Sequence, residues 1–309
     1  AKIISETFDT NHVEVIEGGI DVSEKLLSQR WDYIFFTGSV AVGKVVAKAA
    51  AENLTPVTLE LGGKNPCVID ETANIRLAAK RIVWGKFLNA GQTCIAPDYL
   101  LVHKKIKPQF IEYLKEEIQL AYSENPQNSP DYPRIVNEKN WNRLCQMLIG
   151  ETILFGGKTS ATDNYIEPTL IDEPKQNSLV MKDEIFGPIL PILAFETEED
   201  LEKIIKHYEK PLGFYVFSGN KKFAKKLMKN YSFGGGCIND TMIQFTNNRL
   251  PFGGVGHSGI GAYHGKRSFD IFSHHKAVVV KATWLDIPIR YAPYGEKLKK
   301  IKLLLKWLT

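Results

Sequence analysis

The feature that most constrains this fold is an alternation of short apolar runs with helix-type segments along most of the chain. The strand-like runs lie at 13–19, 33–38, 56–62, 66–70, 189–195 and 213–218. The helix-type segments lie at 21–29, 41–53 and 73–89. This order predicts an α/β protein with mostly parallel sheets, whose consecutive strands are joined by right-handed crossovers.

Length and composition indicate a globular protein. The 309 residues suffice for about two domains, and the content of 44% hydrophobic and 24% charged residues is ordinary. Four cysteines, at 67, 94, 145 and 237, form neither a disulfide framework nor a zinc motif. We therefore expect a reducing, cytoplasmic setting and no metal site.

The net charge of +4 is carried by the end of the chain. Residues 296–309 hold five lysines and one glutamate, so the rest of the chain is neutral. A nucleic-acid binder would carry its basic residues on the folded body, so we expect no nucleic acid as a partner.

This basic end has helical periodicity. Leu298, Ile301, Leu305 and Leu308 recur at helical spacing, with lysines between them. A basic amphipathic helix is typical of contact with an anionic membrane surface, here through 296–309. The alternative is a terminal helix docked on the protein or on a dimer partner.

A glycine-containing turn follows the run at 33–38. Gly38, Gly43 and Lys44 match the spacing of a P-loop, but Val45 replaces the hydroxyl residue that binds Mg²⁺, which disfavours nucleotide hydrolysis. A helix start after such a turn still offers N–H groups to a phosphate. The alternative is a simple turn with Ser39 as the helix cap. The literal G-x-G-x-x-G match at 254–259 lacks the strand and helix that a dinucleotide fingerprint needs, so it predicts a loop.

Two acidic motifs are compatible with a catalytic or binding role. Glu60 ends an apolar run, where burial would raise its pKa and suit it to act as a general base; the alternative is an exposed strand end. Glu184 precedes Phe186, a pair that suits a ribose and a flat heterocycle; the alternative is a turn with a hydrophobic plug.

Cys94 lies in the turn-like stretch "NAGQTCIAPD", unlike Cys67 and Cys145, which lie on apolar patterns. A nucleophilic cysteine needs access and either a lowered thiol pKa or a nearby base. The surroundings of Cys94 favour a shaped loop over core packing.

Taken together, the motifs resemble the aldehyde dehydrogenase superfamily. "FTGS", "TLELGGKNP", "NAGQTC", "EIFGPILPI" and "LPFGGVGHSG" occur in the order of that family. Longer runs such as "TPVTLELGGKNPCVID" and "FDIFSHHKAVV" are most similar to its class 3 branch, which includes fatty aldehyde dehydrogenases.

The resemblance implies NAD(P)-dependent oxidation of a small-molecule aldehyde to a carboxylic acid. Cys94 would be the nucleophile that forms the thiohemiacetal and thioester, and Glu60 the general base. It also implies a site for NAD or NADP formed by Thr37, Gly38, Ser39, Gly43, Leu61, Glu184 and Phe186.

The resemblance further implies a truncated Rossmann-type NAD-binding domain and a complete α/β catalytic domain with a parallel sheet. The expected ranges are 1–60 for the cofactor domain, 61–270 for the catalytic domain, 271–283 for an oligomerisation strand and 284–309 for a basic amphipathic tail. We expect a homodimer, the commonest homo-oligomer.

The family's "PWN" and "KPSE" motifs do not occur in these 309 residues. The first contains the asparagine that completes the family's oxyanion hole, and losing one such donor typically costs about 10²–10³ in rate. We therefore expect this chain alone to be nearly inactive. The competing hypothesis is a non-catalytic fragment that acts through its dimer surface or its basic tail.

Overall fold

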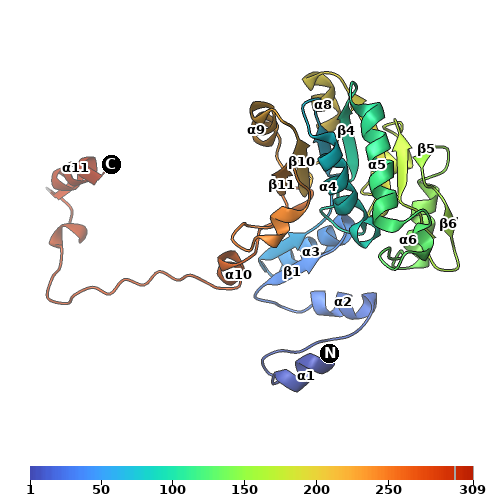
Figure 1. Cartoon of the computed structure of the whole chain (residues 1–309). Helices are drawn as coiled ribbons and strands as arrows, with labels where there is room; N and C mark the ends of the chain where they lie inside the picture. Colours follow the sequence, from blue (N-terminus) through green and yellow to red (C-terminus); the bar gives the residue numbers. More distant parts are fainter. Residues whose placement is uncertain (296, 309) are drawn as a thin grey trace. The chain divides into compact units, whose positions relative to one another are not determined.

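The computed structural model describes residues 1–295 and 297–308 and divides the chain into two compact units, 1–272 and 273–309 (Figure 1). Each unit is described by itself. The first contains both sheets that surround the candidate site.

A seven-stranded sheet forms the body of the first unit, in the order β11-β10-β3-β4-β9-β8-β5. Its strands are β3 (Pro66–Ile69), β4 (Tyr99–His103), β5 (Thr152–Phe155), β8 (Thr169–Asp172), β9 (Ile189–Phe195), β10 (Gly213–Phe217) and β11 (Gly235–Ile238). All neighbours pair in parallel except β5, which is antiparallel to β8. The predicted α/β fold with mostly parallel sheets is thus confirmed.

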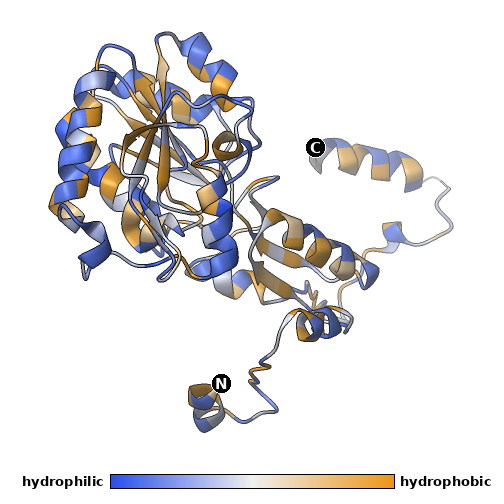
Figure 2. Ribbon diagram, turned by 90° about the vertical axis from the view of Figure 1, so that its right-hand side faces the viewer, coloured by the Kyte–Doolittle hydropathy of each residue, from blue (hydrophilic) through white to orange (hydrophobic). Residues whose placement is uncertain are grey.

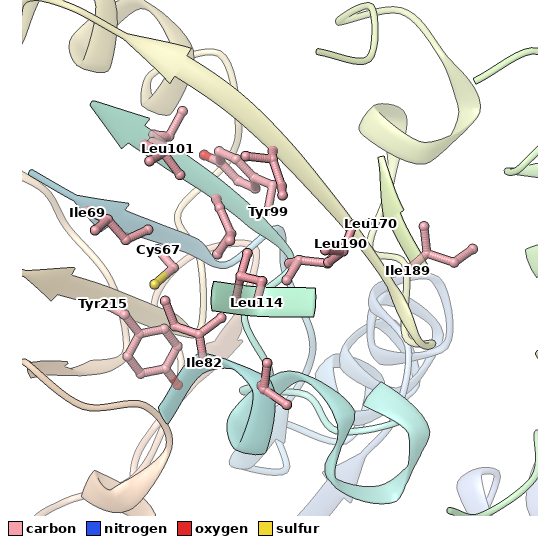
Figure 3. Close-up of a cluster of buried hydrophobic side chains, with 14 of the residues drawn as sticks. Cys67, Ile69, Ile82, Tyr99, Leu101, Leu114, Leu170, Ile189, Leu190 and Tyr215 are labelled. Carbon is pink, nitrogen blue, oxygen red and sulfur yellow. The ribbon is translucent and has the colours of Figure 1, made fainter. Parts of the chain in front are cut away.

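The core of this body lies between the sheet and its helices. Strands β3, β4 and β10 are buried along their whole length. In Figure 3, Cys67 and Tyr215 of adjacent strands lie beside Ile82 of α4 (Ile75–Phe87) and Leu114 of α5 (Lys107–Tyr122). The other helices of this body are α6 (Glu138–Gln146), α7 (Leu179–Lys182), α8 (Glu198–Ile205) and α9 (Lys221–Asn230).

A smaller sheet carries the other half of the candidate site. Its order is β1-β2-β12, from β1 (Ile34–Thr37), β2 (Val57–Glu60) and β12 (Gly259–Ile260). Helix α3 (Val40–Glu52) follows β1, and Ser39 caps it by accepting a hydrogen bond from the Val42 amide at 3.4 Å. The remaining helices of this unit are α1 (Lys2–Thr7), α2 (Ile20–Leu27) and α10 (Lys266–Ile271).

Two sequence-based expectations for this part are wrong. Residues 13–19 form no strand; Val13, Val15 and Ile16 are exposed, and no described strand pairs with them. The strand expected within 33–38 forms as β1, but it alternates between half-buried and exposed residues instead of being buried. Its edge position explains this, because among the described residues β1 pairs only with β2.

The second unit begins with residues 273–282, which have no regular secondary structure in this chain. A strand needs a pairing partner, so the oligomerisation strand at 271–283 stays a prediction. A short turn of 3₁₀ helix (Pro288–Arg290) and helix α11 (Lys297–Leu308) follow. Figure 2 shows hydrophobic and hydrophilic residues interleaved along α11. Two residues of the predicted tail, 296 and 309, lie outside the described residues.

Within 1–295 and 297–308, no helix has both the length and the apolar character needed to cross a membrane.

Candidate active site

A cavity of about 620 Å³ lies where the two sheets of the first unit meet. One wall comes from the carboxyl ends of β1 and β2, and the other from the Cys94 loop, α6 and the segment before β9. Its lining consists of Thr37, Gly38, Ser39, Glu60, Leu61, Gly62, Gln92, Thr93, Cys94, Asn140, Arg143, Glu184 and Phe186. Ligands of α/β sheets commonly bind in such a crevice at the carboxyl ends of the strands.

The structure brings almost all the sequence-predicted site residues to this cavity. Gly43 is the exception, because it lies behind the wall, where α3 packs on Leu61. A Cβ on Gly43 would be 2.5 Å from Leu61 Cδ2, so the missing side chain allows this close packing. Gly43 thus contacts the site through Leu61 and through its N–H, which donates to the carbonyl oxygen of Ser39 at 2.8 Å.

The Cys94 loop is shaped by a left-handed turn. Asn89, Ala90 and Gly91 have φ values of 53°, 51° and 72°. A Cβ on Gly91 would lie 2.3 Å from the carbonyl oxygen of Gly187, so only glycine fits there. The turn lies in the 3₁₀ helix Leu88–Gly91, which follows α4, and it places Cys94 in the cavity wall.

The polar residue just before β3 holds this loop in place. Asn65 is buried, and its Nδ2 donates to the carbonyl oxygens of Cys94 at 2.8 Å and Ala96 at 3.0 Å. Its Oδ1 accepts from the Gly213 amide at 2.7 Å. The loop is therefore tied to two neighbouring strands of the large sheet.

Glu60 is a buried carboxylate without a hydrogen-bond partner. It ends β2, and its side chain is 4% exposed. Neither carboxylate oxygen has a partner among the described residues. Burial raises the pKa of Glu60 to about 7, so near neutral pH it can both accept and release a proton.

Glu184 lies on a segment that a buried ion pair holds against the large sheet. Lys64 Nζ lies 2.5 Å from Asp98 Oδ2 and donates to the carbonyl oxygen of Asp183 at 3.2 Å. The other oxygen of Asp98 accepts from the Ile185 amide at 2.9 Å. These contacts fix the backbone on both sides of Glu184.

The Glu184 carboxylate occupies space that Gly62 leaves free. A Cβ on Gly62 would be 1.9 Å from Glu184 Oε2. Burial, followed by the nearby charge of Asp98, raises the pKa of Glu184 to about 8, while the Gly63 backbone N–H opposes that rise. Arg143 Nη2 donates to the carbonyl oxygen of Ile185 at 2.7 Å and supports the same segment.

Burial raises the pKa of the Cys94 thiol to about 11, and the negative charges of Glu184 and Glu60 add to this effect. The backbone N–H groups of Cys94 and Ile95 oppose it. The structure therefore lacks the lowered thiol pKa that can activate a cysteine, and it places a carboxylate with a raised pKa, Glu60, in the same cavity.

The residues present fit a dinucleotide. Helix α3 has 13 residues and no acidic residue in its first turn, so the dipole at its N-terminus, beside Gly38 and Ser39, favours a phosphate. The two unpartnered oxygens of Glu60 face a cavity that a ligand or water can fill. No group of three or more His, Cys, Asp or Glu side chains suited to a metal occurs in the described part of the chain.

Several polar residues of this site were missed by sequence reasoning: Lys64, Asn65, Asp98, Asn140 and Arg143. Lys64 and Asn65 stand between a glycine pair and a buried strand, and Asp98 directly precedes another. Charged or amide side chains in such places signal a buried network. Asn140 and Arg143 lie on an ordinary amphipathic helix and gave no such signal.

Comparisons with known proteins agree on the family. Residues 1–278 match the model of the aldehyde dehydrogenase family. A 4,4′-diaponeurosporen-aldehyde dehydrogenase of Staphylococcus aureus is 50% identical over 99% of this chain, which covers 67% of that protein. Aldehyde dehydrogenase family 3 member A2 of Rattus norvegicus is 45% identical over 96% of the chain, which covers 62% of it.

The fold agrees as well. A structure described as the substrate-bound state of Staphylococcus aureus AldH superimposes with a TM-score of 0.95 at 49% identity. The match covers 98% of this chain and 67% of that one. The chain thus spans about three fifths to two thirds of the length of these relatives.

Proposed function

The chain belongs to the aldehyde dehydrogenase family, with class 3-like relatives, and we propose that its site serves NAD(P)-dependent oxidation of a small-molecule aldehyde to a carboxylic acid. One observation carries this proposal. Cys94 and Glu60, a carboxylate with no hydrogen-bond partner and a pKa raised to about 7, line the same cavity.

In the proposed reaction, Glu60 takes the proton of the Cys94 thiol, and the sulfur attacks the aldehyde carbon. The Cys94 backbone N–H is a donor for the oxyanion that forms. When bound, NAD(P)⁺ supplies the acceptor for the hydride that leaves this carbon, and a thioester remains on Cys94. Glu60 releases the thiol proton to solvent and then takes a proton from the water that attacks the thioester. The acid leaves, and Glu60 returns this second proton to the Cys94 sulfur.

The cofactor would be held by the residues that the cavity shares with the start of α3. We propose that Gly38 and Ser39 lie near the pyrophosphate, and that Thr37 and Leu61 lie near the nicotinamide. The Glu184 carboxylate would accept hydrogen bonds from the ribose, and Phe186, which is 38% exposed, would pack beside it. Both NAD and NADP are compatible with these residues, and some relatives are named NADP-preferring.

We also propose a homodimer in a cytoplasmic, reducing setting. Residues 273–282 include Val278, Val279 and Val280, which are 72%, 89% and 93% exposed and suit a strand added to a partner. Some relatives are named dimeric. All four cysteines are free, which agrees with a reducing environment.

For a polypeptide made of residues 1–309 alone, we expect turnover far below that of a full-length relative. The family's "PWN" motif, which contains the oxyanion asparagine, does not occur in these 309 residues, and removing one such donor costs about 10²–10³ in rate. Turnover of an aldehyde with NAD⁺ at the rate of a full-length relative would contradict this expectation.

The proposed roles of Cys94 and Glu60 can be tested without fast turnover. The chain is incubated with an aldehyde and NAD⁺ and quenched, and peptides are searched by mass spectrometry for an acyl group on Cys94. Glu60→Gln should slow both the formation and the hydrolysis of this adduct, because the same carboxylate takes the proton of the thiol and the proton of the attacking water. Cys94→Ser should lose all NADH formation, whereas Cys145→Ser should not. NADH formation that survives Cys94→Ser would overturn the proposal.

The end of the chain supports a second role. Helix α11 contains five lysines and no acidic residue, and Leu298, Leu303, Leu305 and Trp307 are 51–90% exposed. We propose that the segment 296–309 contacts an anionic membrane surface. The whole chain should co-sediment with vesicles that contain phosphatidylserine, which is anionic, and not with vesicles that lack it. A chain ending at 295 should stay in the supernatant, and equal sedimentation of the two chains would refute this role.

A further inference from the structure

Three consecutive carbonyl groups of the Cys94 loop are each held by a buried side chain. Asn65 donates to the carbonyl oxygens of Cys94 and Ala96. The Tyr215 hydroxyl of β10 donates to the carbonyl oxygen of Ile95 at 2.6 Å. Asn65 is 1% exposed and Tyr215 is 0% exposed, so water does not replace these bonds easily.

The hydrogen bonding continues behind Tyr215. Gln244 Nε2 donates to the Tyr215 hydroxyl oxygen at 3.1 Å, and Cys237 Sγ donates to Gln244 Oε1 at 2.9 Å. Cys237 lies on β11 directly opposite Tyr215, and Gln244 lies on the 3₁₀ turn Ile243–Thr246. We call Cys237, Gln244 and Tyr215 the relay.

The carbonyl of Ile95 fixes the direction of the relay. Because a carbonyl can only accept, the Tyr215 proton is used there, and the hydroxyl oxygen must receive an N–H from Gln244. The amide oxygen of Gln244 is then left to accept from the thiol. Burial raises the pKa of the Cys237 thiol, so it keeps the proton that it donates.

Holding the carbonyls also aims the N–H groups that face the nucleophile. The carbonyl of Cys94 and the N–H of Ile95 belong to one planar trans peptide and point in opposite directions. The N–H groups of Cys94 and Ile95 lower the pKa of the Cys94 thiol, against burial and the nearby carboxylates. Asn65 therefore fixes the Ile95 N–H directly. The Ile95 carbonyl shares its peptide with the Ala96 N–H, which donates to the Thr93 carbonyl oxygen at 3.0 Å, and that carbonyl shares its peptide with the Cys94 N–H, so the relay fixes the Cys94 N–H through this bond.

We propose that Asn65 and the relay are positioning residues for Cys94: by holding the carbonyls of Cys94 and Ile95, they keep the peptides on both sides of Cys94 in the orientation in which their N–H groups face its sulfur. The inference rests on the proposed role of Cys94 as the nucleophile and adds the hydrogen bonds that keep its thiol reactive. Within the relay, Cys237 is the residue separated from the Cys94 loop by the largest number of hydrogen bonds.

Charged and titratable groups around Cys94 come from other elements. Glu60 lies on β2, Glu184 before β9 and Tyr263 after β12, and Arg143 of α6 lines the same cavity. Relay variants leave all four unchanged. A shift in the titration of Cys94 caused by them therefore reports the loop and not a change of charge.

The test measures alkylation of Cys94 by iodoacetamide in the whole chain, resolved by peptide mass spectrometry, between about pH 8 and pH 12.5, a range that includes the midpoints of the original chain and of the variants. Tyr215→Phe and Gln244→Leu each interrupt the relay. Tyr99→Phe is the matched control, since Tyr99 is also 0% exposed, lies on the same sheet and has a hydroxyl without a partner among the described residues. Circular dichroism verifies that each variant is folded.

We expect Tyr215→Phe and Gln244→Leu to move the pH midpoint of Cys94 alkylation upward by about half a unit, the scale of one hydrogen bond. Cys237→Ala should give a smaller shift in the same direction, and Cys237→Ser, which keeps a donor, should restore the original midpoint. Tyr99→Phe should have no effect.

An unchanged midpoint in folded Gln244→Leu and Tyr215→Phe would overturn the relay, as would an equal shift in Tyr99→Phe. Failure of the underlying function looks different. In that case the original chain itself would carry no acyl group on Cys94 after incubation with aldehyde and NAD⁺, whatever the relay variants do.

Discussion

The two sheets that form the site differ in how well they are packed. Strands β3, β4 and β10 of the large sheet are buried at every position, whereas β1 of the small sheet alternates between half-buried and exposed residues. Among the described residues, the buried hydrophobic cluster of the small sheet consists of Val46, Leu59 and Leu61. The large sheet and its helices share one extensive core.

This difference divides the proposed chemistry. The nucleophile and its supporting hydrogen bonds belong to the large sheet, through Asn65 and Tyr215. The base, Glu60, and the proposed pyrophosphate residues Gly38 and Ser39 belong to the small one. We therefore expect Cys94 to stay ordered under conditions in which the Glu60 side of the cavity opens, because local stability follows buried apolar contact.

The largest expected effects come from removing one core side chain from each sheet. Leu101→Ala on β4, where the side chain is 0% exposed, should lower the free energy of unfolding of the whole unit by about 2–5 kcal/mol. Leu59→Ala on β2, where it is 2% exposed, should instead remove hydrogen-exchange protection mainly from residues 34–60.

Denaturant unfolding and native-state hydrogen exchange measure these two effects. If Leu59→Ala lowered the protection of β3 and β4 as much as that of β1 and β2, the sheets would unfold as one cooperative unit. The contrast drawn between them would then be wrong.

The same contrast explains how far the sequence could predict this molecule. Continuous apolar runs located β3, β9 and β10 of the large sheet, and the run at 189–195 coincides with β9 (Ile189–Phe195). They missed β4, although that strand is buried at every position. The strand predicted at 13–19 is wrong, because an apolar run cannot show whether a neighbouring strand exists to pair with it.

For the site, the motifs identified eight of the residues that line the cavity, including Cys94 and Glu60, and missed others such as Asn140 and Arg143. They could not show that Glu60 lacks a hydrogen-bond partner or that burial raises the pKa of Cys94. Both depend on contacts between segments far apart in the chain. The relay was missed for the same reason, since Gln244 and Cys237 each have an unremarkable local pattern.

A substitution at the junction of the sheets tests how closely their two walls fit. Gly62→Ala would place a methyl group 1.9 Å from Glu184 Oε2, so we expect a loss of about 1–3 kcal/mol in stability from overpacking. The double variant Gly62→Ala/Glu184→Ala removes the clash and should recover most of this loss. Urea midpoints of the four proteins of this cycle measure the coupling, and strictly additive losses would show that the small sheet simply moves aside.

The smallest expected effect is a pH-dependent gain in stability on neutralising Glu60. Its pKa in the folded chain is about 7, above the ordinary value of 4.5, because burial disfavours the charged form. The folded state therefore binds more protons than the unfolded state, and stability falls as the pH rises from about 4.5 through 7. Glu60→Gln carries no charge, so its Tm should exceed that of the original chain by an amount that grows over this range and then levels off.

Glu184→Gln is the matched variant on the large-sheet wall. The pKa of Glu184 is about 8, so the Tm difference between this variant and the original chain should keep growing up to about pH 8. If the Glu60→Gln difference is flat with pH while that of Glu184→Gln grows, then the small sheet opens and hydrates Glu60 at no cost, and its half of the cavity is not closed in solution.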